Sequence, residues 1–147
     1  MPECTFSFII PTRGRPESLS RLCDSIRAHT SHPDQLEIVF VMDSDDQASL
    51  KFEYAGLKIR KVEVAPAMTM GELDIAGYQA ASGRYLMLLN DDVVLRTTAW
   101  DERVLEVFHG YPDGIVLVHV NENIFRQCCP KQDRVVMSVI DTEGFRS

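Results

Sequence analysis

The stretch SFIIPTRGRPESLSRLCDSI, residues 7–26, passes from one secondary-structure pattern to another within a short distance. Phe6–Ile10 is an apolar run that Pro11 ends, which is typical of a buried strand. Pro16 suits the first position of a helix, and Glu17 adds an acidic residue to its first turn. Apolar residues then recur at helical spacing and predict one buried helix face: Leu19, Leu22, Cys23 and Ile26. A strand followed directly by such a helix is the building unit of α/β sheets.

The same alternation of strand and helix patterns continues along the chain. Apolar runs predict further strands at Glu37–Met42, Leu57–Val64, Tyr85–Leu89 and Gly114–Val120. Because these runs are apolar on both faces and are joined by helices, they predict a three-layer α/β fold with a mostly parallel sheet flanked by helices. Residues 1–147 are expected to form a single domain. Asn121–Ser147 is its least regular part, with one further candidate strand at Arg134–Ile140.

Two of the connecting helices carry their own start and stop signals. Thr69 and Glu72 form a capping box, and Gly83 is expected as the C′ residue at the end of the same helix. The buried face of that helix is expected to consist of Leu73, Ala76, Gly77 and Ala80. Thr98 is expected to cap the next helix, which ends near Gly110 and turns four side chains inward: Trp100, Val104, Leu105 and Phe108.

The composition is that of an ordinary globular protein, with 45% hydrophobic and 25% charged residues among 147. A formal net charge of −7 argues against a broad electrostatic grip on nucleic acid. No apolar run has the length of a membrane span, and the N-terminus resembles a first strand rather than a signal peptide. Cys4 and Cys23 fall in apolar patterns, which favours reduced core thiols in a cytoplasmic protein. The adjacent Cys128 and Cys129 leave a redox-active pair as the alternative.

Polar side chains follow three of the predicted strands at the point where each strand ends. The first strand leads into Pro11-Thr12-Arg13, the second into Asp43-Ser44-Asp45-Asp46, and the fourth into Asn90-Asp91-Asp92. In open parallel sheets, ligands bind beyond the carboxyl ends of the strands. The three segments are therefore expected to meet in one binding site.

Asp91 and Asp92 place two carboxylates side by side, which costs energy unless a partner or a cation neutralises them. Oxygen ligands suit Mg²⁺ or Mn²⁺, and Mg²⁺ commonly takes one or two carboxylates together with substrate phosphates and water. A bound diphosphate would supply the missing ligands. A solvated turn or a helix cap explains the sequence Asn-Asp-Asp equally well.

Other charged residues at these strand ends have similar alternatives. The Asp43–Asp46 cluster could bind a base or a ribose, or Asp45 or Asp46 could cap the helix that follows. Arg13 and Arg15 could reach phosphate oxygens or remain solvated loop charges. No serine or cysteine with a nearby histidine suggests a nucleophile, and the chain has no GxGxxG or Walker-type loop.

Three segments resemble, in order and spacing, the N-terminal half of the family 2 glycosyltransferases, which have the GT-A fold: SFIIPTRGRPESLSRLCDSI, EIVFVMDSDD and AASGRYLMLLNDDVV. The resemblance implies a nucleotide pocket lined by Pro11, Thr12, Arg13, Asp43 and Asp91. Within that pocket it implies that Asp43 contacts the base. It also implies that Asp92 is the metal ligand and that Asp91 contacts the ribose or the metal.

The function implied by this resemblance is that of a metal-dependent glycosyltransferase. Such an enzyme uses Mn²⁺ or Mg²⁺, binds a nucleoside diphosphate sugar (a UDP-sugar is the favoured donor), and transfers the sugar to an acceptor hydroxyl. Members of the family usually continue well beyond this length, and their second half carries the acceptor site and the catalytic base. The chain is therefore expected to be short or truncated at its C-terminal end. No base is assigned among its late acids, Asp133, Asp141 and Glu143.

Two other functions remain open. A non-catalytic nucleotide-sugar-binding module, completed by a partner, would share the strand-end motifs and lack turnover. A nucleotidyltransferase would share the alternation of strands and helices, but it usually has a glycine-rich basic loop after the first strand, and TRGRP contains a single glycine.

Overall fold

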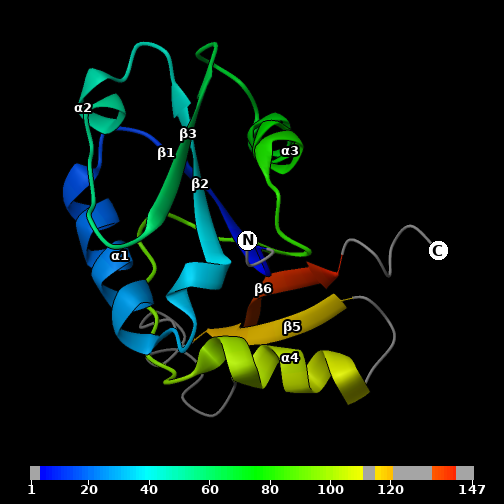
Figure 1. Cartoon of the computed structure of the whole chain (residues 1–147). Coiled ribbons are helices and arrows are strands. Elements are labelled where there is room, and N and C mark those ends of the chain that lie inside the picture. The colour runs from blue at the N-terminus through cyan, green and yellow to red at the C-terminus, as the bar shows by residue number, and fades with distance from the viewer. Residues whose placement is uncertain (1–3, 111–114, 121–133, 142–147) are drawn as a thin grey trace.

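The computed structural model of the chain describes residues 4–110, 115–120 and 134–141, which form one sheet with helices on both of its faces (Figure 1). Its strands are β1 (Phe6–Thr12), β2 (Leu36–Asp43), β3 (Lys58–Val64), β4 (Tyr85–Leu88), β5 (Ile115–Val120) and β6 (Arg134–Asp141). Its helices are α1 (Pro16–His29), the short α2 (Gln47–Leu50), α3 (Met70–Ala80) and α4 (Trp100–Gly110), with a 3-10 turn, η1, at Pro33–Gln35.

The sheet has the strand order β3-β2-β1-β4-β6-β5. β1 pairs in parallel with β2 and β4, and β2 pairs in parallel with β3. The predicted α/β fold with a mostly parallel sheet is therefore confirmed. The candidate strand near the C-terminus is present as β6, but it lies between β4 and β5 and runs antiparallel to both. Strand patterns give no pairing direction, so the sequence could not place it.

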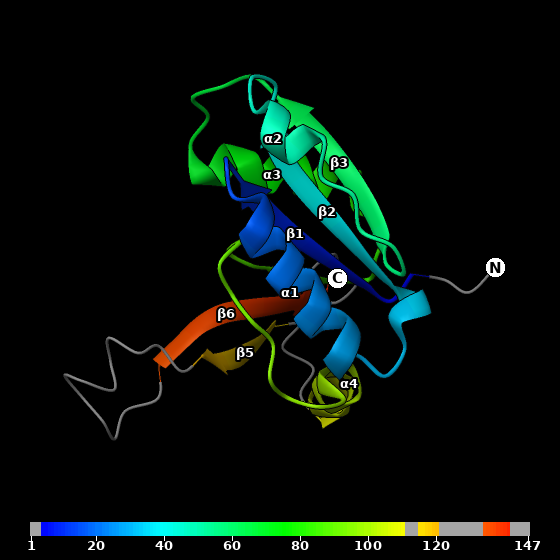
Figure 2. The same cartoon turned by 90° about the vertical axis from the view of Figure 1, so that its left-hand side faces the viewer.

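The sheet separates the core into two layers, one covered by α1 and α4 and the other by α3 (Figures 1 and 2). The larger layer contains the predicted inward faces of α1 and α4, which pack on Phe6, Phe8 and Ile10 of β1. The smaller layer lies under α3, where Ile9, Val41 and Leu86 meet the half-buried Leu73 and Ala76. Alternate residues of β1 thus serve opposite faces of the sheet, as expected for a central strand. Cys23 lies in the larger layer, where burial raises the pKa of its thiol to about 12.

Helix α4 starts in a different way from the predicted one. It begins at Trp100 after Ala99, whose φ of 55° is left-handed, so Thr98 does not occupy the cap position and that prediction is wrong. The buried Asp101 in its first turn instead accepts hydrogen bonds from the backbone N–H groups of Ser31 and His32, at 3.0 and 2.9 Å. These bonds tie α4 to the segment that follows α1.

The end of α3 also departs from the prediction. The capping box of Thr69 and Glu72 is confirmed, but the helix ends at Ala80 with Ala81 in an extended conformation, so Gly83 is not a C′ residue. Gly83 is a glycine because of a close approach. A Cβ there would lie 2.5 Å from Ser7 Oγ and 2.7 Å from Ser7 N. Its N–H donates to Ser7 Oγ at 2.8 Å, which seats the start of β4 against β1.

Candidate functional site

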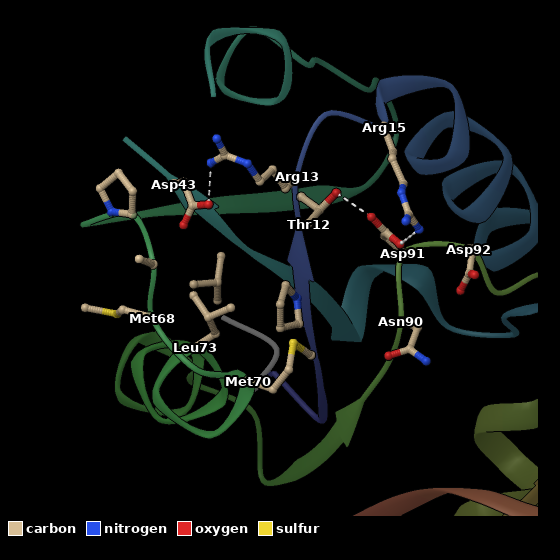
Figure 3. A pocket seen from close by; sticks show the side chains of 14 residues that line it. Thr12, Arg13, Arg15, Asp43, Met68, Met70, Leu73, Asn90, Asp91 and Asp92 are labelled. Atoms are coloured by element: carbon tan, nitrogen blue, oxygen red, sulfur yellow. Dashed lines mark hydrogen bonds and ion pairs between the residues drawn. The ribbon is translucent and has the colours of Figure 1, made fainter. Parts of the chain in front are cut away.

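A pocket of about 670 Å³ lies at the carboxyl ends of β1, β2 and β4 (Figure 3). All the site residues named from the sequence line it: Pro11, Thr12, Arg13, Asp43, Asp91 and Asp92. Arg15 and Asn90 line it as well. The prediction that three strand ends meet at one edge therefore holds as a statement of geometry.

The register of the sheet explains how these residues meet. Leu88 of β4 lies opposite Ile9 of β1, so Asp91, three residues further on, reaches the level of Thr12. Pairing between β1 and β4 ends at Ile9 and Leu88, whereas β1 continues beside β2 as far as Thr12. Pro11 can belong to β1 because a proline needs no ladder partner where one neighbouring strand has already ended.

Asp91 is a buried carboxylate that the protein itself holds in place. It is 8% exposed. The hydroxyl of Thr12 donates to its Oδ2 at 2.9 Å, and the guanidinium of Arg15 lies 3.2 Å from its Oδ1. Arg15 is thus a counter-charge for one of the two adjacent carboxylates, Asp91. The sequence pattern did not reveal this partner.

Asp92 differs from its neighbour in burial and in contacts. It is exposed, and within the described residues no hydrogen bond or ion pair engages its carboxylate. In Figure 3 it points away from the Thr12–Asp91–Arg15 contacts. Asp92 is therefore the carboxylate of this strand end that is open to a ligand.

Arg13 joins the ends of β1 and β2. Its guanidinium lies 2.5 Å from Asp43 Oδ2 and contacts both carboxylate oxygens of Asp45, at 2.7 and 3.2 Å. These hydrogen bonds, to Asp45 and then to Asp43, raise the pKa of Arg13, and the same pairing holds the pKa of Asp45 below its usual value. Arg13 thus brings Asp43 to the pocket in a fixed orientation.

Asp46, the next carboxylate along the chain, has a structural role at the start of α2. Asp46 caps α2 by accepting from the N–H of Ser49 at 3.3 Å, and it also accepts from the N–H of Gly14 at 2.7 Å. Burial alone would raise the pKa of Asp46, but its hydrogen bonds to Ser49 and Gly14 outweigh that effect and lower it. Of the two cap candidates in the Asp43–Asp46 cluster, Asp46 is the one used.

The opposite wall of the pocket is apolar and is formed by the loop between β3 and α3 together with the first turn of α3. It consists of Pro66, Ala67, Met68, Met70 and Leu73. Met68 and Met70 are exposed, and Ala67 has a left-handed φ of 70°. Methionine adapts its shape easily, which suits a wall against which a flat or irregular group packs. The sequence predicted the capping box and the burial of Leu73 in this segment, but apolar residues there show no charge pattern that would mark them as the wall of a binding site.

The resemblance implies a divalent cation, and the carboxylates at the pocket could hold one. Among the residues that the structure describes, no group of three or more His, Cys, Asp or Glu side chains is placed to hold a metal ion. Asp91 and Asp92 give two carboxylates beside a pocket with room for a ligand. Two carboxylates suit Mg²⁺ or Mn²⁺ completed by phosphate oxygens and water, and they do not suit a closed zinc site.

The sequence profile of the family described as glycosyl transferase family 2 matches residues 7–126. The chain belongs to this family. The match spans the described strand ends that line the pocket, from Pro11 to Asp92.

Solved structures share the fold at low sequence identity. A mannosyltransferase from Pyrobaculum calidifontis, solved with GDP-Man and Mn²⁺, superposes with a TM-score of 0.75 at 13% identity, over 94% of this chain and 44% of that one. S. aureus TarS 1-349 with UDP-GlcNAc gives a TM-score of 0.68 at 16% identity, over 80% of this chain and 34% of that one. The chain thus spans less than half the length of either glycosyltransferase.

No curated protein sequence matches the chain. Within the described part of the chain, every helix is too short or too polar to cross a membrane.

The late acids named from the sequence do not complete the site. Asp141 ends β6 opposite Tyr85, the first residue of β4, which places its backbone at the edge of the sheet away from the pocket. Asp133 and Glu143 lie outside the described residues, as do Cys128 and Cys129. The pocket in the described residues therefore has three carboxylates, Asp43, Asp91 and Asp92.

Proposed function

We propose that this pocket binds a nucleoside diphosphate sugar together with Mn²⁺ or Mg²⁺, and that the protein transfers the sugar to an acceptor hydroxyl. Membership of glycosyl transferase family 2 supports the reaction class. The observation that carries the proposal is the convergence of Thr12, Asp43, Asp91 and Asp92 on one pocket at the carboxyl ends of parallel strands. The mannosyltransferase structure contains GDP-Man and the TarS structure contains UDP-GlcNAc. We therefore include hexosyl transfer from a GDP-sugar or from a UDP-sugar in the proposal. A UDP-sugar remains the favoured donor.

The pocket residues named from the sequence each have a role in this proposal. Asp43, held by Arg13, accepts a hydrogen bond from the base, while Pro11 and Thr12 shape the floor beneath the nucleoside. Asp92, with Asp91 beside it, holds the cation. The bound cation would neutralise the charge that develops on the departing diphosphate. The apolar wall keeps water from one side of the pocket.

The transfer itself requires a base that takes the proton of the attacking hydroxyl as the sugar–phosphate bond breaks. All three pocket carboxylates already have a task in donor binding. We therefore propose that the acceptor site and the base are supplied from outside the described residues, either by the same chain or by a partner. We further propose that residues 1–147 form a single domain and that the protein works in the cytoplasm.

A second candidate, a non-catalytic nucleotide-sugar-binding module, is favoured by that same observation about the carboxylates. The two candidates differ in turnover. A binding module would show nucleotide affinity with Mn²⁺ but neither hydrolysis nor transfer.

Calorimetry with UDP and with GDP, each with and without Mn²⁺, tests the proposal. The expected result is binding of at least one nucleotide that strengthens when Mn²⁺ is present. Absence of binding for both nucleotides, with Mn²⁺ present, would refute the proposed function. Incubation with UDP-sugars and GDP-sugars then separates the enzyme from the binding module, because only the enzyme releases free nucleotide.

A further inference from the structure

Among the described residues, the side chain of Arg15 has one polar partner, Asp91. Its NH1 lies 3.2 Å from Asp91 Oδ1, and its side chain is 57% exposed. Arg15 precedes Pro16 at the start of α1, and its side chain makes no capping hydrogen bond to the helix. Asp91 is buried, but the arginine side of this long ion pair is open to solvent, so water can solvate the guanidinium while it changes partners.

The neighbouring arginine shows the contrast. Arg13 contacts Asp43 and Asp45 through three N–O pairs, two of them at 2.7 Å or less. Arg13 is thus held by two aspartates at the end of β2, whereas among the described residues the guanidinium of Arg15 contacts Asp91 alone, at 3.2 Å. Of the two arginines that line the pocket, Arg15 is the one free to meet a ligand.

Asp91 would keep its place without Arg15. Its other oxygen, Oδ2, accepts from the hydroxyl of Thr12 at 2.9 Å, and Thr12 is itself buried at the end of β1. If the guanidinium leaves, Oδ1 becomes available while the carboxylate stays oriented by Thr12.

We propose that Arg15 is an exchangeable counter-charge, which neutralises Asp91 in the empty site and moves to the diphosphate when a nucleotide binds. Guanidinium groups bind phosphate oxygens in a two-pronged arrangement, so the diphosphate is a better partner than one carboxylate oxygen. The exchange exposes Asp91 Oδ1 to the divalent cation. This inference rests on the proposed function, since it assumes a diphosphate ligand with its cation.

The exchange has a consequence for the order of binding. With Arg15 on Asp91, the empty site attracts a cation weakly. A diphosphate withdraws the positive charge from the carboxylate, so nucleotide and cation strengthen each other's binding, and that coupling is reciprocal. A protein built this way avoids holding a cation without its substrate.

The variants Arg15→Gln, Arg15→Lys and Asp91→Asn test the exchange, with Arg103→Gln as the control. Arg103 is exposed on α4 and does not line the pocket, and its substitution removes the same charge. Two quantities are measured: the affinity for Mn²⁺ alone, by electron paramagnetic resonance of the free ion, and the affinity for UDP or GDP with Mn²⁺, by calorimetry. Thermal melts establish that each variant is folded.

Arg15→Gln is expected to move the two affinities in opposite directions. Mn²⁺ alone should bind on the order of ten-fold more tightly, because a nearby positive charge is gone. Nucleotide with Mn²⁺ should bind on the order of ten-fold more weakly, because the diphosphate loses its arginine. Arg15→Lys should restore the wild-type Mn²⁺ affinity, Asp91→Asn should weaken Mn²⁺ binding, and Arg103→Gln should change neither affinity.

An arginine with a purely structural role would lower both affinities or neither. If Arg15→Gln binds Mn²⁺ alone no more tightly than the wild type, or binds nucleotide as tightly, the exchange is overturned while the proposed function survives. If the wild type binds no nucleotide, the proposed function fails, and the exchange fails with it.

Discussion

Replacing Glu37 by alanine should destabilise the fold although this residue lies far from the pocket. Glu37 is fully buried near the start of β2. Its Oε1 accepts from Ser7 Oγ at 2.7 Å and from the N–H and the hydroxyl of Ser82 at 2.6 and 2.9 Å. Its Oε2 lies 3.8 Å from Lys58 Nζ and from Arg60 NH2. One carboxylate thereby holds β1, β2 and the segment before β4 in register.

The magnitude follows from what the substitution leaves behind. Lys58 and Arg60 have side chains 58% and 46% exposed, so water can solvate them once the carboxylate is gone. Ser82 is exposed as well, so water can also solvate its donors. The hydroxyl of Ser7 is fully buried and would lose its acceptor, and an unsatisfied buried donor costs about 1–3 kcal/mol. We therefore expect Glu37→Ala to lower the free energy of unfolding by about 1–3 kcal/mol.

Glu37 should also give the stability a dependence on pH. Burial alone would raise its pKa, but the hydrogen bonds from Ser82 and Ser7 and the charge of Arg60 outweigh burial and lower the pKa below the ordinary glutamate value. The fold therefore favours the ionised form more than water does. This stabilisation is fully present above the unfolded pKa, about 4.3, and is lost as the pH falls through the lower folded pKa. Glu37→Gln, which keeps one acceptor oxygen, should remove that part of the acid sensitivity.

Urea denaturation measures both effects, with the fluorescence of Trp100, the chain's one tryptophan, as the signal. Glu63→Ala is the matched control, because Glu63 is an exposed glutamate in β3 and its loss should cost less than about 0.5 kcal/mol. The reasoning fails if Glu37→Ala and Glu63→Ala unfold at the same urea concentration. It also fails if Glu37→Gln loses stability between pH 5 and pH 3 as steeply as the wild type.

Two further substitutions probe the packing that positions the site. Gly83→Ala should cost about 1–3 kcal/mol in urea denaturation, because the added Cβ would press on Ser7. Gly71→Ala, which meets open space, should cost nothing, and equal effects would exclude the packing explanation. Trp100→Ala should cost about 3–5 kcal/mol by circular dichroism, since Trp100 packs on Phe6 and Phe8 with ring centroids 4.9 and 5.0 Å away. A loss below 1 kcal/mol would mean that this aromatic cluster adds little.

The sequence was sufficient for those features that depend on local periodicity. The apolar run of β1, the spacing of Leu19, Leu22 and Ile26 in α1, and the capping box of Thr69 are each contained within a few residues. The meeting of three strand ends followed from a general rule about parallel sheets. These inferences needed no knowledge of long-range contacts.

The contacts that the sequence did not reveal join residues far apart in the chain. Thr12 and Asp91 are 79 positions apart, and Arg15 and Asp91 are 76 apart. Arg13 and Arg15 are two positions apart, and only the structure shows that one joins two loops while the other meets Asp91. Gly83 was misassigned for the same reason, because Ser7, which excludes a side chain there, lies 76 positions away. Local pattern cannot specify which distant partner a charged or small residue meets.

The central claim is that the strand end at Asp92 forms a cation-dependent nucleotide site, and the thermal shift of Asp92→Ala tests it most directly. Melting temperatures of the variant and of the wild type are compared with and without Mn²⁺ plus UDP or GDP. Because Asp92 is exposed and unpaired among the described residues, the variant without ligand should melt at the wild-type temperature or slightly above it. The shift on adding Mn²⁺ and nucleotide should be present in the wild type and absent in the variant. A variant that loses about 1 kcal/mol of stability, as loss of a helix cap would cause, and keeps the full ligand-induced shift would contradict the account.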